Sequence, residues 1–146
     1  MIIRQMTRED IPRIVQIEQE CFSLPWSENV LSSELKNPLS LWVVATDDGA
    51  VIGYVGAQIV PDEADMMNLA VDAQYRRQGI GKALVEHLIA SLQERMVRSL
   101  TLEVRVSNAP AVSLYEGMGF LTVGRRPNYY QKPKEDAWIL RKEWQL

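Results

Sequence analysis

The sequence predicts an α/β fold, a mixed β-sheet with helices on both faces, in a single domain that spans residues 1–146. Two observations predict this class. Segments with the apolar pattern of strands and segments with helical periodicity follow one another in the order β-α-α-β-β-β-α-β-α-β-β, which suits a sheet covered by helices. The 146 residues, 47% of them apolar and 24% charged, suit one soluble globular domain with a full core.

The first half of the chain carries signals for where its helices begin and end. Thr7 is a suitable N-cap because acidic residues follow it, and Ser27 can cap a second helix that Asn37-Pro38 ends. Asp47-Asp48-Gly49 has the composition of a hairpin turn. The expected elements are a strand at Ile2–Ile3, a helix capped by Thr7 that runs to Cys21, a helix from Ser27 to about Lys36, and strands at Leu41–Thr46 and Val51–Val60.

The second half alternates strands with helices. Apolar residues recur every four positions from Ile80 to Leu92, which predicts an amphipathic helix. Every second residue of Ser99–Val106 is apolar, so Glu103 shares the other face of a strand with Thr101 and Arg105. The expected elements are a strand at Met66–Val71, a helix from Gly81 to about Met96, a strand at Ser99–Val106, a helix capped by Asn108 that closes at Gly117–Gly119, a strand from Phe120 to about Gly124, a polar and aromatic loop at Arg125–Lys134, and a strand at Asp136–Arg141.

The stretch from Asn68 to Leu84 organises the chain, because a buried strand there leads into a helix through a turn that contains Gly79 and Gly81. The first N–H groups of a helix have no partner within it, and the helix dipole adds partial positive charge at the same place. Glycine has no Cβ, so an anion can approach the main chain closely. The turn therefore predicts a pyrophosphate-binding site, and an ordinary glycine-containing turn is the alternative.

Two familiar phosphate-binding motifs fit this turn poorly. The P-loop pattern requires a glycine where Arg76 stands and a Ser or Thr where Ala83 stands. The dinucleotide-binding fingerprint requires Gly or Ala where Leu84 stands. A third pattern, Arg/Gln-x-x-Gly-x-Gly/Ala after a strand, is met by Arg76-Arg77-Gln78-Gly79-Ile80-Gly81.

Composition excludes several classes of protein. Cys21 and His87 are the only cysteine and the only histidine, so the chain has no disulfide framework, no His/Cys zinc site and no Cys–His or Ser–His catalytic pair. A net charge of -3 argues against a general nucleic-acid binder. The chain has no apolar run of membrane-spanning length and no signal peptide, so a cytoplasmic protein is expected.

Glu103 and Tyr115 are the candidate catalytic residues. Glu103 lies in mid-strand on a face that a doubly covered sheet would normally bury, and a buried carboxylate is costly unless it is paired or used. It could pair with a neighbour such as Arg105, or it could serve as a general base. Tyr115 could be a packed ring with a satisfied hydroxyl or a catalytic acid. Taken separately, each residue favours the structural interpretation.

Taken together, these residues form a pattern that resembles a known family. From Glu103 to Phe120 the chain reads Glu-x-Arg-x-x-Asn-x-x-Ala-x-x-Leu-Tyr-x-x-x-Gly-Phe, which, with the glycine turn, resembles the Gcn5-related N-acetyltransferases (GNAT). Three further motifs resemble the RimI branch of that family, the bacterial ribosomal-protein alanine N-acetyltransferases. They are Phe22-x-x-Pro25-Trp26-Ser27, Asn68-Leu69-Ala70-Val71 and Arg126-x-x-Tyr129-Tyr130.

The resemblance implies a mostly antiparallel central sheet, acetyl-CoA as co-substrate without a metal, and a ribosomal-protein N-terminus as substrate, with no direct contact to nucleic acid or membrane. Glu103 would act as general base through water, and Tyr115 as the acid that faces the leaving sulfur. The residues implied to bind acetyl-CoA are Leu69, Ala70, Val71, Arg76, Arg77, Gln78, Gly79, Ile80, Gly81, Lys82 and Asn108. Those implied to hold the peptide are Phe22, Pro25, Trp26, Tyr129 and Tyr130.

The acceptor is less closely specified than the acetyl donor. An α-amine has a pKa of about 7.7–8.0 against about 10.4 for lysine, so making it nucleophilic near pH 7 costs ~3 kcal/mol less and suits a modest base. A lysine or a small-molecule amine is an alternative acceptor, because loops on one fold diverge easily. A module that senses acyl-CoA without turnover is a second alternative, which the presence of both Glu103 and Tyr115 disfavours.

Overall fold

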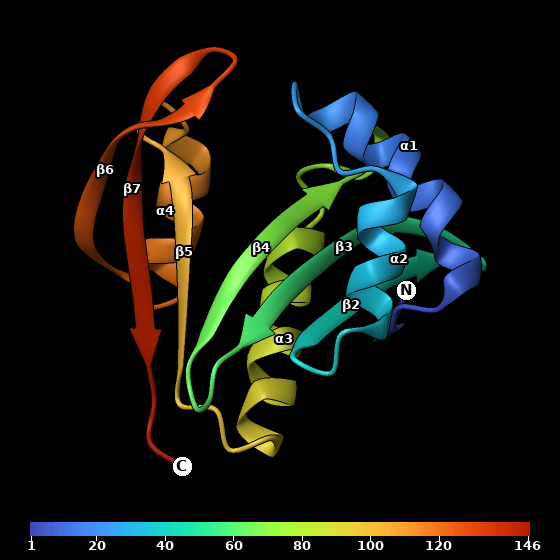
Figure 1. Ribbon diagram of the computed structural model, residues 1–146, viewed down its shortest axis with the longest axis horizontal. Helices are drawn as coiled ribbons and strands as arrows, with labels where there is room; N and C mark the ends of the chain where they lie inside the picture. The colour runs from blue at the N-terminus through green and yellow to red at the C-terminus, as the bar shows by residue number, and fades with distance from the viewer.

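The computed structural model describes all 146 residues and forms one seven-stranded sheet with helices on both faces (Figure 1). The strand order is β1-β2-β3-β4-β5-β7-β6, and every neighbouring pair is antiparallel except β4–β5. The strands are β1 (Ile2–Gln5), β2 (Ser40–Asp47), β3 (Ala50–Ile59), β4 (Ala64–Val71), β5 (Ser99–Arg105), β6 (Leu121–Gln131) and β7 (Lys134–Glu143). The mixed, mostly antiparallel α/β fold expected from the sequence is confirmed.

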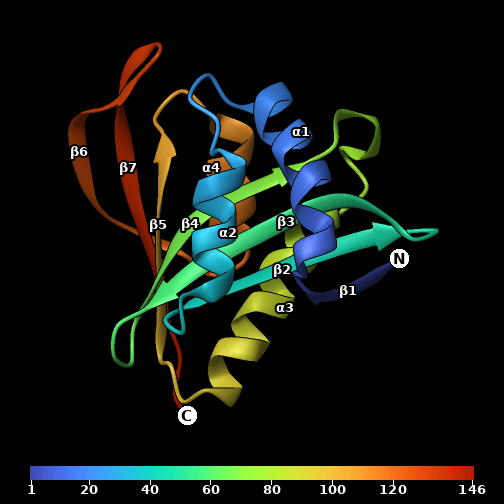
Figure 2. The ribbon, with the colours of Figure 1, turned by 45° about the vertical axis from the view of Figure 1, so that its right-hand side comes forward.

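Two pairs of helices cover the two faces of the sheet (Figures 1 and 2). The helices α1 (Ile11–Cys21) and α2 (Glu28–Lys36) lie on one face, and α3 (Ile80–Glu94) and α4 (Ala109–Gly117) lie on the other. Short 3-10 turns at Arg8–Asp10 and Ala73–Tyr75 precede α1 and follow β4. No helix of the fold is both long enough and apolar enough to cross a bilayer.

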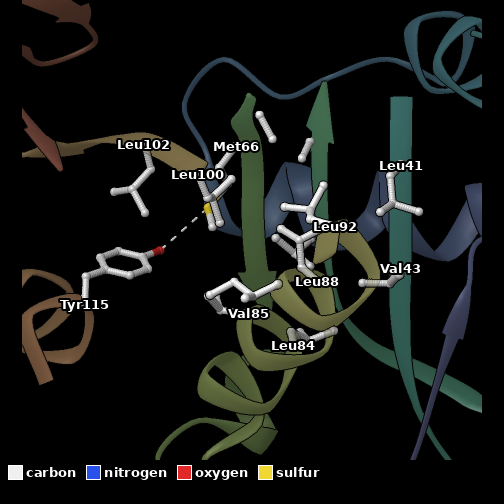
Figure 3. Packing of buried hydrophobic residues seen from close by; sticks show 14 of the residues in the cluster. Leu41, Val43, Met66, Leu84, Val85, Leu88, Leu92, Leu100, Leu102 and Tyr115 are labelled. Atoms are coloured by element: carbon white, nitrogen blue, oxygen red, sulfur yellow. Dashed lines mark hydrogen bonds between the residues drawn. The ribbon is translucent and has the colours of Figure 1, made fainter. Parts of the chain in front are cut away.

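The larger core lies between α3 and the sheet (Figure 3). Leu84, Leu88 and Leu92, which the four-residue spacing placed on one side of a helix, are fully buried there. The second core lies under α1 and α2, around Ile14, Ile17 and Tyr54. The middle strands are therefore covered on both faces by these two cores.

The parallel pair of strands, β4 and β5, is short. Only Ala64 with Leu100 and Asp65 with Thr101 are in register, although the strands have eight and seven residues. Beyond these pairs the strands diverge, and the sheet opens between them (Figure 1). From Met66 onward, the edge of β4 that faces β5 therefore has no neighbouring strand.

The loop expected at Arg125–Lys134 is a wrong prediction. This segment forms most of strand β6 and the turn into β7, and its register shifts between Arg126 and Tyr130. The irregular stretch contains Pro127 and Asn128, and Asn128 has a φ of 56°. Pro and Asn in a polar run are ordinary loop signals, but β6 is an edge strand, and an edge strand tolerates both.

Candidate active site

A cleft of about 880 Å³ lies where β4 and β5 diverge. Its walls come from β4, β5, α4, the connection between α1 and α2, and the hairpin of β6 and β7. Of the residues singled out from the sequence, those that line it are Phe22, Trp26, Leu69, Glu103, Asn108, Tyr115, Tyr129 and Tyr130. Those outside its lining are Pro25, Ala70, Val71, Arg76, Arg77, Gln78, Gly79, Ile80, Gly81 and Lys82. The structure thus brings both candidate catalytic residues and all the predicted aromatic residues to one cleft.

The start of α3 has the geometry of an anion-binding site. Gly79 is the N-cap with a φ of 77°, a left-handed conformation that favours glycine, and no side chain caps the helix. The first backbone hydrogen bond of α3 runs from Ala83 N to Gly79 O at 3.0 Å, and the N–H groups of the three residues 80–82 have no acceptor in the chain. These N–H groups and the helix dipole favour a negatively charged ligand.

An ion pair supports the turn that leads to α3. Asp72 accepts a hydrogen bond from Gln74 N at 2.8 Å and pairs with Arg13 of α1, which also donates to Val51 O at 3.2 Å. Asp72 is buried, so this pairing compensates a charge that would otherwise be costly. The strand-to-helix turn is therefore tied to α1 and β3 rather than left as a free loop.

The open edge of β4 presents backbone N–H groups. Asp72 N donates to Ile52 O on β3 at 2.8 Å. Since successive residues of a strand direct their N–H groups to opposite edges, those of Leu69 and Val71 point away from β3. They lie on the edge that lacks a neighbouring strand, between the cleft and the start of α3. An extended molecule with amide groups could pair along this edge as a strand would.

Glu103 is less buried, and paired with a different residue, than the sequence suggested. Its side chain is 20% exposed at the cleft, because no helix covers that face of β5. Its Oε1 accepts from Arg126 Nε at 3.2 Å, whereas Arg105 pairs at 3.2 Å with Glu135 on the neighbouring strand β7. The face of β5 that carries Glu103 is therefore less covered than a doubly covered sheet would make it, and the ion pair considered as an alternative is present, with Arg126 in the place expected for Arg105. A solvent-accessible carboxylate of this kind can accept a proton through water.

Tyr115 lies in the core near Leu102 and Met66 (Figure 3). It is on the opposite face of the sheet from Glu103, although both residues line the cleft. Its ring packs edge to face on Phe120, with centroids 5.5 Å apart. Its hydroxyl donates to Met66 Sδ at 3.9 Å, which is a weak acceptor. Burial, with a smaller contribution from Tyr130, raises the pKa of Tyr115. The hydroxyl is therefore protonated, and no strong acceptor in the chain holds it.

The hairpin of β6 and β7 brings two tyrosines to the rim of the cleft. Tyr129 and Tyr130 pack edge to face at 5.0 Å, and the guanidinium of Arg105 lies 4.3 Å from the Tyr130 ring. Burial, followed by the charges of Tyr129 and Glu103, raises the pKa of Tyr130 to about 12. Ser23, from the connection between α1 and α2, donates to Lys132 O at 2.5 Å and closes the rim from the other side.

Glu18, which lies behind the lining of the cleft and contacts it through Asn68 and Trp26, was not singled out from the sequence. It is fully buried on α1 and accepts hydrogen bonds from Trp26 N at 2.8 Å, Asn68 Nδ2 at 2.5 Å and the Tyr54 hydroxyl. Burial raises the pKa of Glu18, and these three hydrogen bonds act in the opposite direction. A usable signal was present, since Glu18 lies four residues after the core residue Ile14, on the buried face of the helix.

A family model and a curated relative both indicate similarity to N-acetyltransferases. The acetyltransferase (GNAT) family model matches residues 11–120. The ribosomal protein bS18-alanine N-acetyltransferase of Escherichia coli strain K12 is 42% identical over 140 residues, 94% of each chain.

Two solved structures are similar over nearly the whole chain. The crystal structure of the ribosomal-protein-S18-alanine N-acetyltransferase from Escherichia coli has a TM-score of 0.91 at 40% identity, over 99% of this chain and 94% of that one. The NatC complex bound to Gag peptide and CoA has a chain with a TM-score of 0.86 at 28% identity, over 99% and 98%.

Proposed function

The chain belongs to the acetyltransferase (GNAT) family, and from this we propose that it transfers acetyl from acetyl-CoA to the α-amine of a protein N-terminus. The proposed substrate is the N-terminal alanine of a small-subunit ribosomal protein, as the names of the relatives at 40% and 42% identity suggest. Such a substrate would place the reaction in the cytoplasm.

One observation carries this proposal. The cleft between β4 and β5 has an unpaired strand edge on one wall, which leads to the free N–H groups of α3, and a solvent-accessible carboxylate, Glu103, on the other. A long molecule with amides and a diphosphate could lie along the first wall. An amine that enters from the aromatic rim would meet Glu103 on the opposite wall.

The residues at the start of α3 fit the diphosphate of acetyl-CoA. A Cβ at Gly79 would meet no atom within 4 Å, and one at Gly81 would meet only Leu114 and Val71 at 4.0 Å, so the space in front of the helix start is open. Arg76, Arg77 and Lys82 add positive charge beside the free N–H groups. The N–H groups of Leu69 and Val71, on the open strand edge, suit the amide groups of the pantetheine arm.

The proposed roles follow from where each group lies. When bound, acetyl-CoA supplies the acetyl group as a thioester. An N–H group of the Leu69–Val71 edge would stabilise negative charge on the acyl oxygen. Glu103 would take the proton of the amine through water, and the Tyr115 hydroxyl would donate a hydrogen bond to the departing sulfur. Asn108, whose Oδ1 caps α4 by accepting from Ala111 N at 3.3 Å, would contact the pantetheine arm at the cleft wall.

The peptide would enter from the aromatic rim. Phe22 and Trp26 form one side of this rim, and Tyr129 and Tyr130 form the other. Pro25 is exposed and lies outside the lining of the cleft. We therefore propose that it shapes the connection between α1 and α2 and does not contact the peptide. This arrangement places aromatic side chains on both sides of the entrance above Glu103, where they would pack against the first residues of the peptide.

Mass-spectrometric acetyl transfer tests the proposal. The panel holds an alanine-starting peptide with the N-terminal sequence of the ribosomal substrate, the same peptide with a blocked N-terminus and one lysine, and a simple polyamine. Glu103→Gln should lower kcat/KM at least about 100-fold, as loss of a general base does. Glu86→Gln, on the exposed side of α3 with no hydrogen bond, is the matched control.

The outcomes separate the candidate functions. Acetylation of the free N-terminus alone, much slowed in Glu103→Gln and unchanged in Glu86→Gln, supports the proposal. Transfer to the lysine peptide or the polyamine instead would keep the acetyl-CoA site and overturn the choice of acceptor. Binding of acetyl-CoA without transfer to any of the three would favour a sensing module.

A further inference from the structure

A polar side chain in an otherwise apolar strand, Asn68 of β4, lines the cleft and has one polar atom without a partner. Its Nδ2 donates to Glu18 Oε2 at 2.5 Å, whereas its Oδ1 accepts no hydrogen bond within the chain. The only fully buried side-chain polar atom without a partner is Ser99 Oγ, so Asn68 Oδ1 is accessible from the cleft. It is therefore an unused acceptor in the proposed active site.

A β-bulge turns Asn68 toward the peptide side of the sheet. Asn68 is in register with Gly56 and Met66 with Ala57, which leaves Met67 as the extra residue of β4. Met67 packs in the core under α1 and α2, and its neighbour Asn68 contacts Glu18 of α1. Two adjacent side chains thus lie on the same face, which a regular strand does not allow.

Glu103 lies on that same face across the cleft. Its neighbours Leu102 and Val104 are buried in the core that contains α3, so the Glu103 side chain points to the face that carries α1 and α2. Asn68 and Glu103 therefore face the same mouth from opposite walls, and both are among its lining.

The chemistry of Glu18 sets the orientation of the Asn68 amide. Three donors, Trp26 N, the Tyr54 hydroxyl and the Asn68 amide, converge on its two oxygens, so both oxygens of Glu18 act as acceptors. Asn68 must then present its NH2 group to Glu18 and its carbonyl oxygen to the cleft.

From this geometry we propose that Asn68 Oδ1 binds the α-amino group of the substrate, and that Glu18 is a positioning residue that holds the Asn68 amide in the required orientation. This inference rests on the proposed function. A neutral acceptor suits the position, because a second carboxylate would stabilise the ammonium form of the amine and oppose its loss of a proton.

Peptide binding to the enzyme saturated with CoA tests the inference without requiring turnover. The two probes are the alanyl peptide and its propionyl counterpart, in which hydrogen replaces the α-amino group. In Asn68→Ala, the Kd of the alanyl peptide should rise about tenfold, the size expected for one hydrogen bond from a charged donor. The Kd of the propionyl peptide should not change, and acetyl-CoA affinity should be retained.

Further variants give matched comparisons. Asn68→Leu keeps the branched shape of the side chain without its polar atoms and should reproduce the result, so the test survives if Asn68→Ala does not fold. Asn29→Ala, at an exposed asparagine of α2 with no side-chain hydrogen bond, should bind both peptides as the wild type does. In Glu18→Gln, the new amide needs an acceptor and would turn the Asn68 amide over, so the Kd of the alanyl peptide should rise similarly. Combining it with Asn68→Ala should add little.

The outcomes are distinct from those of the proposed function. If the wild type acetylates the alanyl peptide but Asn68→Ala binds it unchanged, the inference is wrong and the function stands. A parallel rise in the Kd of both peptides would mean that Asn68 only shapes the site, and a loss of acetyl-CoA affinity would assign it to the cofactor. Either result overturns the inference. If the wild type acetylates no N-terminus, the proposed function itself fails.

Discussion

Replacing Tyr115 with phenylalanine separates its proposed chemical role from its role in packing. The Tyr115 ring is buried against Phe120, and phenylalanine keeps that contact. The change removes only a hydroxyl whose one partner is the thioether of Met66 at 3.9 Å. Because the Tyr115 hydroxyl is proposed to face the departing sulfur, Tyr115→Phe should lower turnover while acetyl-CoA still binds.

The magnitudes follow from these contacts. An ordinary hydrogen bond contributes about 1 kcal/mol to stability, and a thioether is a weak acceptor, so the free energy of unfolding should change by less than about 1 kcal/mol. General acid catalysis contributes about 100- to 10,000-fold to rate. Burial raises the pKa of Tyr115 and makes it a poorer acid, so we expect the lower end, a fall in kcat of about 100-fold.

Three measurements on the same preparation decide the matter. Steady-state kinetics with the alanyl peptide gives kcat, calorimetry gives the Kd of acetyl-CoA, and urea denaturation gives the free energy of unfolding. Unchanged kcat would remove Tyr115 from the mechanism. A loss of stability well above 1 kcal/mol would refute the argument from packing, since it would mean that the Tyr115 hydroxyl makes a hydrogen bond stronger than its contact with Met66.

Three further predictions concern the anion site, the sheet and alkaline pH. Gly81→Asp places a carboxylate at the start of α3, where acidic residues stabilise a helix, so thermal stability should be kept. The KM of acetyl-CoA should rise at least about tenfold, because the carboxylate repels the diphosphate. The control is Gly81→Ala, which has room for its Cβ. Gly56→Ala would place a Cβ 2.3 Å from the ring of Trp42, and urea denaturation should show a loss of about 2 kcal/mol or more. Burial raises the pKa of Tyr130 from 10 to about 12, so the folded state favours its neutral form. The contribution of this shift to the free energy of unfolding is complete below pH 10 and is lost between about pH 10 and pH 12. Stability in urea should therefore fall over this range, less steeply in Tyr130→Phe, and an equal slope in both proteins would contradict the assignment.

Prediction from the sequence succeeded where local chemistry decides the structure. The caps at Ser27 and Asn108 lie where expected, and α3, expected from Gly81 to about Met96, spans Ile80–Glu94, because capping and helical periodicity depend on nearby residues. It failed at Arg125–Lys134, where pairing with β7 overrides the loop character of a polar segment. It also failed for the surroundings of Glu103, because alternation tells which residues share a face but not whether anything covers that face.

The amino-acid sequence by itself therefore determined the order of the elements, the family and several of the residues that line the cleft. Only the tertiary structure decided that β4 and β5 pair over two residues and then diverge, which creates the cleft. It also decided that Glu18 reaches Asn68, fifty residues away in sequence, through a bulge in β4. The physical reason is that strand register and the pairing of buried charges depend on contacts between distant segments, and such contacts leave little local signal in the chain.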